Sequence, residues 1–125
     1  MNDKEFWGLV VDVGRILLEH VHTAQIADDL LITYGDVARE LPYEFNPRNL
    51  DSPLYELSSL CEKLGLPLIS TIVVNQDTLM PGLGYYNAFF VGMKTEQKRI
   101  EAFTQQFYKV SQCKDWSPLA NALGL

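Results

Sequence analysis

The chain has 125 residues, the size of one ordinary domain, and its hydrophobic content of 47% and charged content of 21% are typical of globular proteins. We therefore expect a single globular domain over residues 1–125. The formal net charge is −6. The apolar runs are too short to span a bilayer, and the acidic, polar start does not resemble a secretory signal. The sequence thus predicts a cytoplasmic protein without a membrane partner.

The first half of the chain predicts three helices. The first has Asp3 as its N-cap and apolar residues at the helical period as far as Val21, with Gly8 and Gly14 inside the pattern indicating close packing of a neighbour. Residues 23–29 predict a turn or a short helical piece. The second helix starts at Thr33 as N-cap, is short, and ends before a proline at residue 42. Residues 43–51 predict a loop.

The third helix has Ser52 as its N-cap and Pro53 at the first helical position, and it ends at Gly65 and Pro67. Its apolar stripe includes Cys61, which we interpret as a buried hydrophobic residue rather than a reactive thiol.

The second half predicts two strands and a last helix. Residues 68–74 form a β-branched apolar run that predicts a buried strand, and residues 85–91 predict a second strand, so that the two would make a small sheet or wing. A long helix opens at Thr95 and is expected to bury Ile100, Phe103, Phe107 and Val110, after which Trp116 packs back onto the body. These elements predict an α+β fold, with about four helices around a small β-sheet, in an arrangement that could be winged-helix-like.

Residues 32–38, which read ITYGDVA, resemble the start of the helix-turn-helix in the alkylguanine-DNA alkyltransferase and alkyltransferase-like families. Arg48, the helix from Ser52, residues 66–69 (LPLI) and residues 82–85 (GLGY) then follow in the family's order, so that the likeness covers about residues 32–86. The resemblance implies a winged-helix domain that binds DNA or recognises lesions through Arg48 and the helix from Ser52.

The active site of that family is missing from this sequence. Where the family has Pro-Cys-His-Arg, residues 70–75 read STIVVN, with neither a thiol nor an imidazole. Alkyl transfer needs a thiolate that a neighbouring base activates, so the sequence excludes the transfer reaction. No Ser/His/Asp set and no dinucleotide loop is present either. We therefore predict a protein that is not an enzyme and has no cofactor.

The charge is unevenly distributed along the chain. Residues 1–64 hold five basic and twelve acidic residues, whereas residues 65–125 hold five basic and four acidic residues. Residues 33–64, which would contact DNA, hold three basic and six acidic residues, which disfavours binding to phosphates. The acidic half is either a solvated surface or a face that docks on a basic partner.

The leading functional prediction is a non-catalytic protein-binding module with an acidic face at Asp36, Glu40 and Glu44. Its partner would be a protein with a basic surface, as for a small inhibitor, immunity or anti-restriction type protein that acts on nucleic-acid machinery. The alternative is a DNA-binding or lesion-recognising alkyltransferase-like domain without transfer activity, in which Arg48 contacts DNA.

Two smaller groups of residues complete the sequence-based predictions. Tyr85, Tyr86, Phe89 and Phe90 alternate between the faces of the second predicted strand, so two of them would be exposed and available for a protein interface if they are not core. The histidines of the His-x-His sequence at residues 20–22 diverge on a helix, so we predict no metal site there.

Overall fold

The computed structural model describes all 125 residues, and its secondary structure is mainly helical. The α-helices are α1 (Asp3–Thr23), α2 (Tyr34–Glu40), α3 (Asp51–Lys63), α4 (Leu83–Phe89), α5 (Glu96–Gln112) and α6 (Ser117–Ala122). Two short strands, β1 (Ile32–Thr33) and β2 (Val73–Val74), and three 3-10 turns, Ala27–Leu30, Pro47–Asn49 and Ile69–Ile72, complete the fold. None of these helices has the length and apolar character that crossing a bilayer requires. The α+β class is thus confirmed in its broad form, with six helices in place of about four.

Helix α1 forms one side of the main hydrophobic core. Its apolar stripe is buried at Leu9, Val10, Val13 and Leu17, as its sequence period predicts. The N-cap is Asn2 and not the predicted Asp3. The side-chain oxygen of Asn2 accepts a hydrogen bond from the Glu5 N–H at 2.8 Å.

The two glycines of α1 have different surroundings. A Cβ atom at Gly14 would lie 2.5 Å from Leu123 Cδ1 and 3.0 Å from Leu57 Cδ2, so Gly14 lets the C-terminal segment and α3 approach α1 closely. A Cβ atom at Gly8 would meet nothing within 4 Å. The expected close packing is therefore confirmed at Gly14 and wrong at Gly8.

Helix α3 runs through the centre of the core, where Leu57 and Cys61 are fully buried. Burial raises the pKa of the Cys61 thiol to about 11, which agrees with a packing role for this residue. The helix begins at residue 51, and Leu50, which has no capping side chain, stands at its N-cap position, so the predicted Ser52 cap is wrong. The helix is followed by Gly65 with a φ of +72°, as the predicted stop at this glycine requires.

The sheet is a parallel pair in which Ile32 faces Val73 and Thr33 faces Val74. Only the last two residues of the predicted strand 68–74 lie in a strand, because residues 69–72 form a 3-10 turn. This turn is held against α3 by Ser58, whose hydroxyl oxygen accepts the Ser70 N–H at 3.1 Å. The β-branched run is buried as predicted, but its residues 69–72 form a turn and not a strand.

The second predicted strand, residues 85–91, is wrong, since these residues lie mostly in helix α4. In a helix, residues four positions apart share a face, so Tyr85 lies beside Phe89, with ring centroids 6.2 Å apart. A strand would instead have placed half of the aromatic residues on the opposite face. The sheet consequently pairs β2 with β1, and the predicted wing and winged-helix arrangement are not confirmed.

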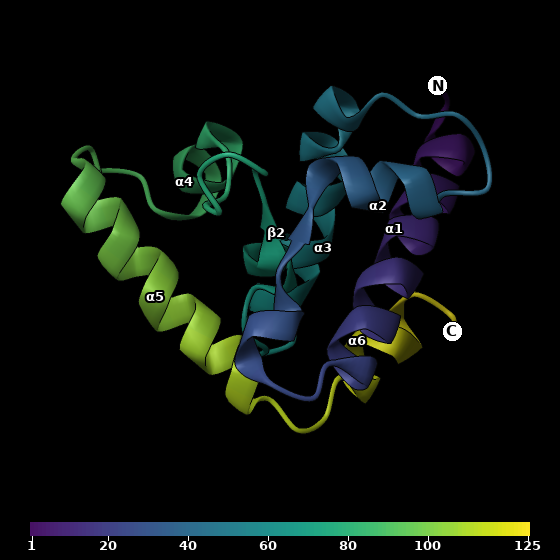
Figure 1. The fold of residues 1–125 in the computed structure, drawn as a ribbon. Helices are drawn as coiled ribbons and strands as arrows, with labels where there is room; N and C mark the ends of the chain where they lie inside the picture. The colour runs from purple at the N-terminus through teal and green to yellow at the C-terminus, as the bar shows by residue number, and fades with distance from the viewer.

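Helix α5 lies on one side of the molecule, away from α1 and α6, with β2 and α3 between them (Figure 1). Its Thr95 N-cap is confirmed by a hydrogen bond from the Lys98 N–H. Its predicted burial is correct for Val110 but wrong for Ile100, which is 45% exposed. Beyond α5, Trp116 is buried against the main core, as predicted.

Candidate functional site

A broad groove runs along α2 and the loop that follows it. We call it the α2 groove. Its volume is about 930 Å³, and it is lined by Gly35, Ala38, Arg39, Leu41, Pro42, Tyr43, Glu44, Phe45, Asn46 and Pro47. Thr33 caps α2 by accepting a hydrogen bond from the Asp36 N–H at 3.1 Å, so the helix begins directly at the end of β1.

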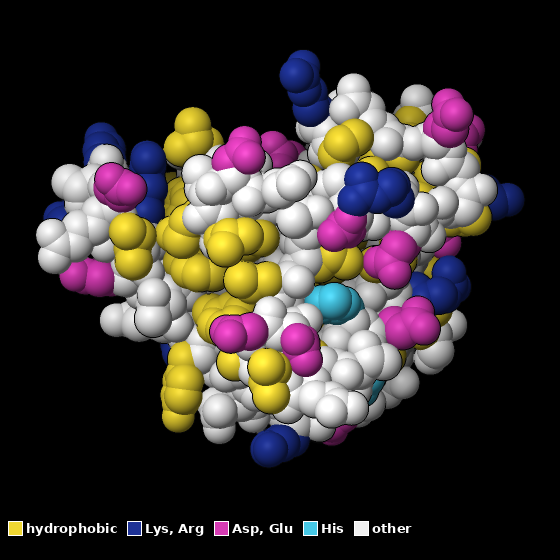
Figure 2. Space-filling model, viewed as in Figure 1, with side chains coloured by type: hydrophobic (Ala, Val, Ile, Leu, Met, Phe, Trp, Pro, Cys, Tyr) yellow, Lys and Arg dark blue, Asp and Glu magenta, His cyan; other side chains and the backbone are white.

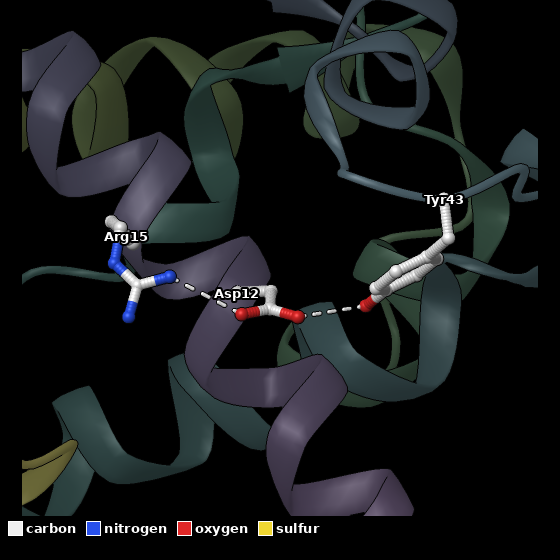
Figure 3. Close-up of polar contacts among 3 residues, drawn as sticks. All are labelled: Asp12, Arg15 and Tyr43. Carbon is white, nitrogen blue, oxygen red and sulfur yellow. Dashed lines mark hydrogen bonds and ion pairs between the residues drawn. The ribbon is translucent and has the colours of Figure 1, made fainter.

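The loop that forms one wall of the α2 groove is tied to α1 by Tyr43. The Tyr43 hydroxyl donates a hydrogen bond to Asp12 Oδ2 at 2.9 Å, and Arg15 Nη1 donates to Asp12 Oδ1 at 3.2 Å (Figure 3). Burial and the Asp12 carboxylate raise the pKa of the Tyr43 phenol to about 12, so this hydroxyl stays protonated and can donate at neutral pH. The contact fixes the loop that carries Glu44.

The three predicted acidic-face residues lie on α2 and this loop, but their charges are not equally available. Asp36 forms an ion pair with Arg39, one turn further along α2. Glu40 and Glu44 are exposed and form no ion pair. In Figure 2, basic and acidic side chains alternate over the region of α1 and α2. The face therefore offers two free carboxylates within a mixed charged surface.

A second hollow lies at the carboxyl ends of β1 and β2, and we call it the sheet-edge cavity. Its volume is about 430 Å³, and its lining consists of Thr33, Tyr34, Gly35, Pro47, Arg48, Asp51, Val74, Asn75, Gln76 and Gly82. Because Gly35 and Pro47 also line the α2 groove, the two hollows adjoin each other.

The wall of the sheet-edge cavity is built by close contacts with the first turn of α4. The Tyr34 hydroxyl accepts a hydrogen bond from the Gly82 N–H at 2.9 Å. A Cβ atom at Gly84 would lie 2.9 Å from Asp51 Oδ2, so only glycine lets α4 approach this carboxylate so closely. Burial raises the pKa of the Tyr34 phenol, the Gly82 hydrogen bond opposes this shift, and the Asp51 charge adds to it.

Arg48, the residue predicted to contact DNA, lies at this cavity. It belongs to the turn Pro47–Asn49, where Asn46 Oδ1 accepts the Arg48 N–H at 3.0 Å, and its side chain is exposed. Neither Arg48 nor Asp51 forms an ion pair, although both line the same cavity. An arginine and an aspartate are thus available to a ligand at one site.

The predicted aromatic patch is not an exposed set of alternating rings. Tyr85 and Tyr86 are 7% and 4% exposed, and Phe89 and Phe90 are half-buried, so the expectation of two exposed rings is wrong. Phe89 stacks on Tyr55 of α3 with ring centroids 5.6 Å apart. Figure 2 shows that hydrophobic side chains gather over α4 and between α4 and α5.

Of the residues that line the sheet-edge cavity, the sequence-based prediction named only Arg48 as functional; it missed, among others, Tyr34, Asp51, Asn75 and Gln76. One signal was present, since polar residues at 75 and 76 directly follow a predicted buried strand. The sequence did not predict that this strand pairs with residues 32–33, and without that pairing the site cannot be located. The structure also contains no group of three or more His, Cys, Asp or Glu side chains placed to hold a metal ion.

Comparison of this chain with protein-family models, with curated proteins and with solved structures finds no match.

Proposed function

We propose that this protein is a non-catalytic protein-binding module whose α2 groove, with Asp36, Glu40 and Glu44 beside it, contacts a partner with a basic surface. One observation carries the proposal: the groove is lined by apolar Ala38 and Leu41 and by charged Arg39 and Glu44. Specific protein interfaces have this composition, with an apolar centre and a polar rim.

The free carboxylates give the proposed interface its charge preference. Glu40 and Glu44 have no basic neighbour within ion-pair distance, so each can pair with a cation of the partner. Complementary charges at a rim act mainly on the rate of association and on the choice of partner. A protein groove that binds nucleic acid is basic, because it neutralises phosphates. This supports an inhibitor, immunity or anti-restriction type role against nucleic-acid machinery.

Four buried hydroxyl groups, those of Ser58, Ser70, Thr71 and Tyr85, support a non-catalytic role, since they bond within the fold. The Ser58 hydroxyl donates to Ser70 Oγ at 2.6 Å, and the hydroxyls of Thr71 and Tyr85 lie 2.8 Å apart. These contacts join α3, the turn before β2 and α4. Their role is to satisfy polar groups in the core.

The first prediction concerns charge reversal at the groove. A variant with Asp36→Lys, Glu40→Lys and Glu44→Lys should keep nearly the wild-type Tm, because exposed charges contribute little to folding. Partner proteins captured from the native host, identified by mass spectrometry and then purified, should associate with the variant about tenfold more slowly or worse at low salt. Surface plasmon resonance at two ionic strengths measures this rate.

A matched control separates the groove from net charge. Glu19, Glu62 and Glu101 are exposed and lie on α1, α3 and α5, not on α2 or the loop that follows it, and their change to lysine alters the net charge by the same amount. This control variant should associate nearly as fast as the wild type. Equal slowing in both variants, or an unchanged rate with the groove variant, would show that the acidic residues are only a solvated surface.

A second candidate function is a DNA-binding or lesion-recognising domain of the alkyltransferase-like type, without transfer activity and with a winged-helix-like use of α2 and α3. The observation that favours it is the exposed Arg48 side chain, which has no acidic partner and stands at the sheet-edge cavity. An arginine in this setting is free to contact a phosphate or a base edge.

A further inference from the structure

The sheet-edge cavity contains a pair of opposite charges that the fold itself does not use. Arg48 and Asp51 are three residues apart in sequence and line the same cavity, yet they do not form an ion pair with each other or with any other residue. Surface arginines and aspartates this close in sequence would ordinarily gain from pairing when their geometry allows it. Both side chains are exposed, so both charges are available to a third group.

The Asp51 side chain lies beside α4. Asp51 is the first residue of α3, and its Oδ2 atom lies where a Cβ atom of Gly84 would be only 2.9 Å away. The backbone of α4 thus passes directly beside the carboxylate. Because Asp51 is exposed and lines the cavity, its carboxylate can accept a hydrogen bond from a ligand there.

The neutral residues of the cavity add both donors and acceptors. Tyr34 accepts the Gly82 N–H, which leaves its own hydroxyl proton free to donate. Asn75 donates its side-chain N–H to the Met80 carbonyl at 3.3 Å, which leaves its side-chain oxygen free to accept. Gln76 stands beside it and is exposed. The lining therefore suits a compact polar ligand.

The place and size of the cavity also suit a small molecule. It lies outside the carboxyl ends of two parallel strands, at the point where the chain leaves β1 for α2 and β2 for the loop before α4. Open parallel sheets bind ligands at this edge. The volume of about 430 Å³ falls within the usual range for small-molecule sites.

We propose that the sheet-edge cavity binds a small ligand that carries one anionic group and one N–H donor group, with Arg48 holding the anion and Asp51 accepting from the donor. A planar guanidinium matches a carboxylate or a phosphate in a bidentate manner, and a carboxylate accepts well from an ammonium or amine. Two sources supply this chemistry: a free α-amino acid, and a nucleoside monophosphate whose base carries an exocyclic amine. The proposal does not depend on the protein interface at the α2 groove.

The experiment titrates the full chain with each α-amino acid and with the amine-bearing nucleoside monophosphates up to about 10 mM, with NMR chemical shifts or calorimetry as the readout. We expect one of the two sources to bind. If it is an amino acid, its amide, which lacks the anion, and its deaminated acid, which lacks the ammonium, should each bind at least about tenfold more weakly. If it is a nucleotide, the nucleoside, which lacks the phosphate, and a nucleotide whose base has no exocyclic amine should each bind at least about tenfold more weakly.

Two variants assign the binding to the cavity. Arg48→Met and Asp51→Asn should each weaken the ligand by about tenfold or more, whereas the control Arg39→Met, which changes an exposed arginine of the α2 groove, should not. Circular dichroism confirms that each variant is folded, and Arg48→Met alone suffices if Asp51→Asn unfolds. The proposal is overturned if no ligand of either source binds, if binding survives Arg48→Met, or if the single-group analogues bind equally well. Tight binding of duplex DNA, with no binding of either small ligand, would overturn it too.

Discussion

Tyr85 and Tyr86 are adjacent, both are buried, and their hydroxyl groups differ in what they contact. The Tyr85 hydroxyl lies 2.8 Å from the Thr71 hydroxyl, while the Tyr86 hydroxyl is buried without a hydrogen-bond partner. Arg99 lies over the Tyr86 ring at 5.7 Å from its centroid, which adds a cation–π contact but does not satisfy the hydroxyl. Burial raises the pKa of both phenols, for Tyr86 to about 12.

This difference gives a paired prediction. Tyr85→Phe should lower the free energy of unfolding by about 1 to 3 kcal/mol, because it leaves the buried Thr71 hydroxyl without its partner. Tyr86→Phe removes a hydroxyl that has no partner, so it should be neutral or stabilise the fold by about 1 kcal/mol. Urea unfolding of the two variants measures both changes. A larger loss for Tyr86→Phe than for Tyr85→Phe would mean that the assignment of these hydroxyl contacts is wrong.

Helix α1 contains a second natural pair, Gly8 and Gly14, which tests how neighbouring elements constrain a helix. Gly8→Ala should stabilise the protein by about 0.5 to 1 kcal/mol, because alanine is the better helix former and nothing occupies the space. Gly14→Ala gains the same helix propensity, but its Cβ would clash with Leu57 and Leu123. This overpacking should cost about 1 to 3 kcal/mol of stability and so cancel or exceed the gain in propensity. Thermal and urea melts compare the two. Equal stabilisation by both changes would refute the close contact of α1 with α3 and the C-terminal segment.

At the level of elements, the sequence was informative where a local signal decides the structure. The N-caps at Thr33 and Thr95 depend on one side chain and the next turn of backbone, and both are correct. The strand predicted at residues 85–91 failed because four aromatic residues in two adjacent pairs fit alternation as well as a helical face. What decides between them is tertiary, since α4 packs against α3 and the Tyr85 hydroxyl meets Thr71.

The net charge of the whole molecule sets its behaviour toward nucleic acid. With a formal charge of −6, the protein repels the phosphate backbone at long range, and the exposed Arg48 is a single cation. In about 150 mM salt we expect no binding to duplex DNA, modified or unmodified, that is tighter than about 100 μM. Fluorescence anisotropy measures this. Micromolar binding that Arg48→Ala abolishes would instead favour the alkyltransferase-like alternative.

The candidate site was predictable only in part, because it is assembled from distant segments. Asp36, Glu40 and Glu44 could be named from local charge, and Arg48 from a resemblance. Asp51 and Asn75 could not, since they meet only after β1 pairs with β2, and the two strands are separated in the sequence by α2 and α3. No local pattern encodes the parallel register of two strands that are two residues long.

The parallel pairing of β1 and β2 also has a consequence for how the protein folds. It joins residue 32 to residue 73 and so closes a loop that contains α2 and α3. Closing a loop of this length costs chain entropy, which two residue pairs cannot offset unless the enclosed helices already pack. We therefore expect the sheet-edge cavity to appear together with the cooperative core and not before it. A nascent chain that has not yet released β2 from the ribosome would not have the cavity.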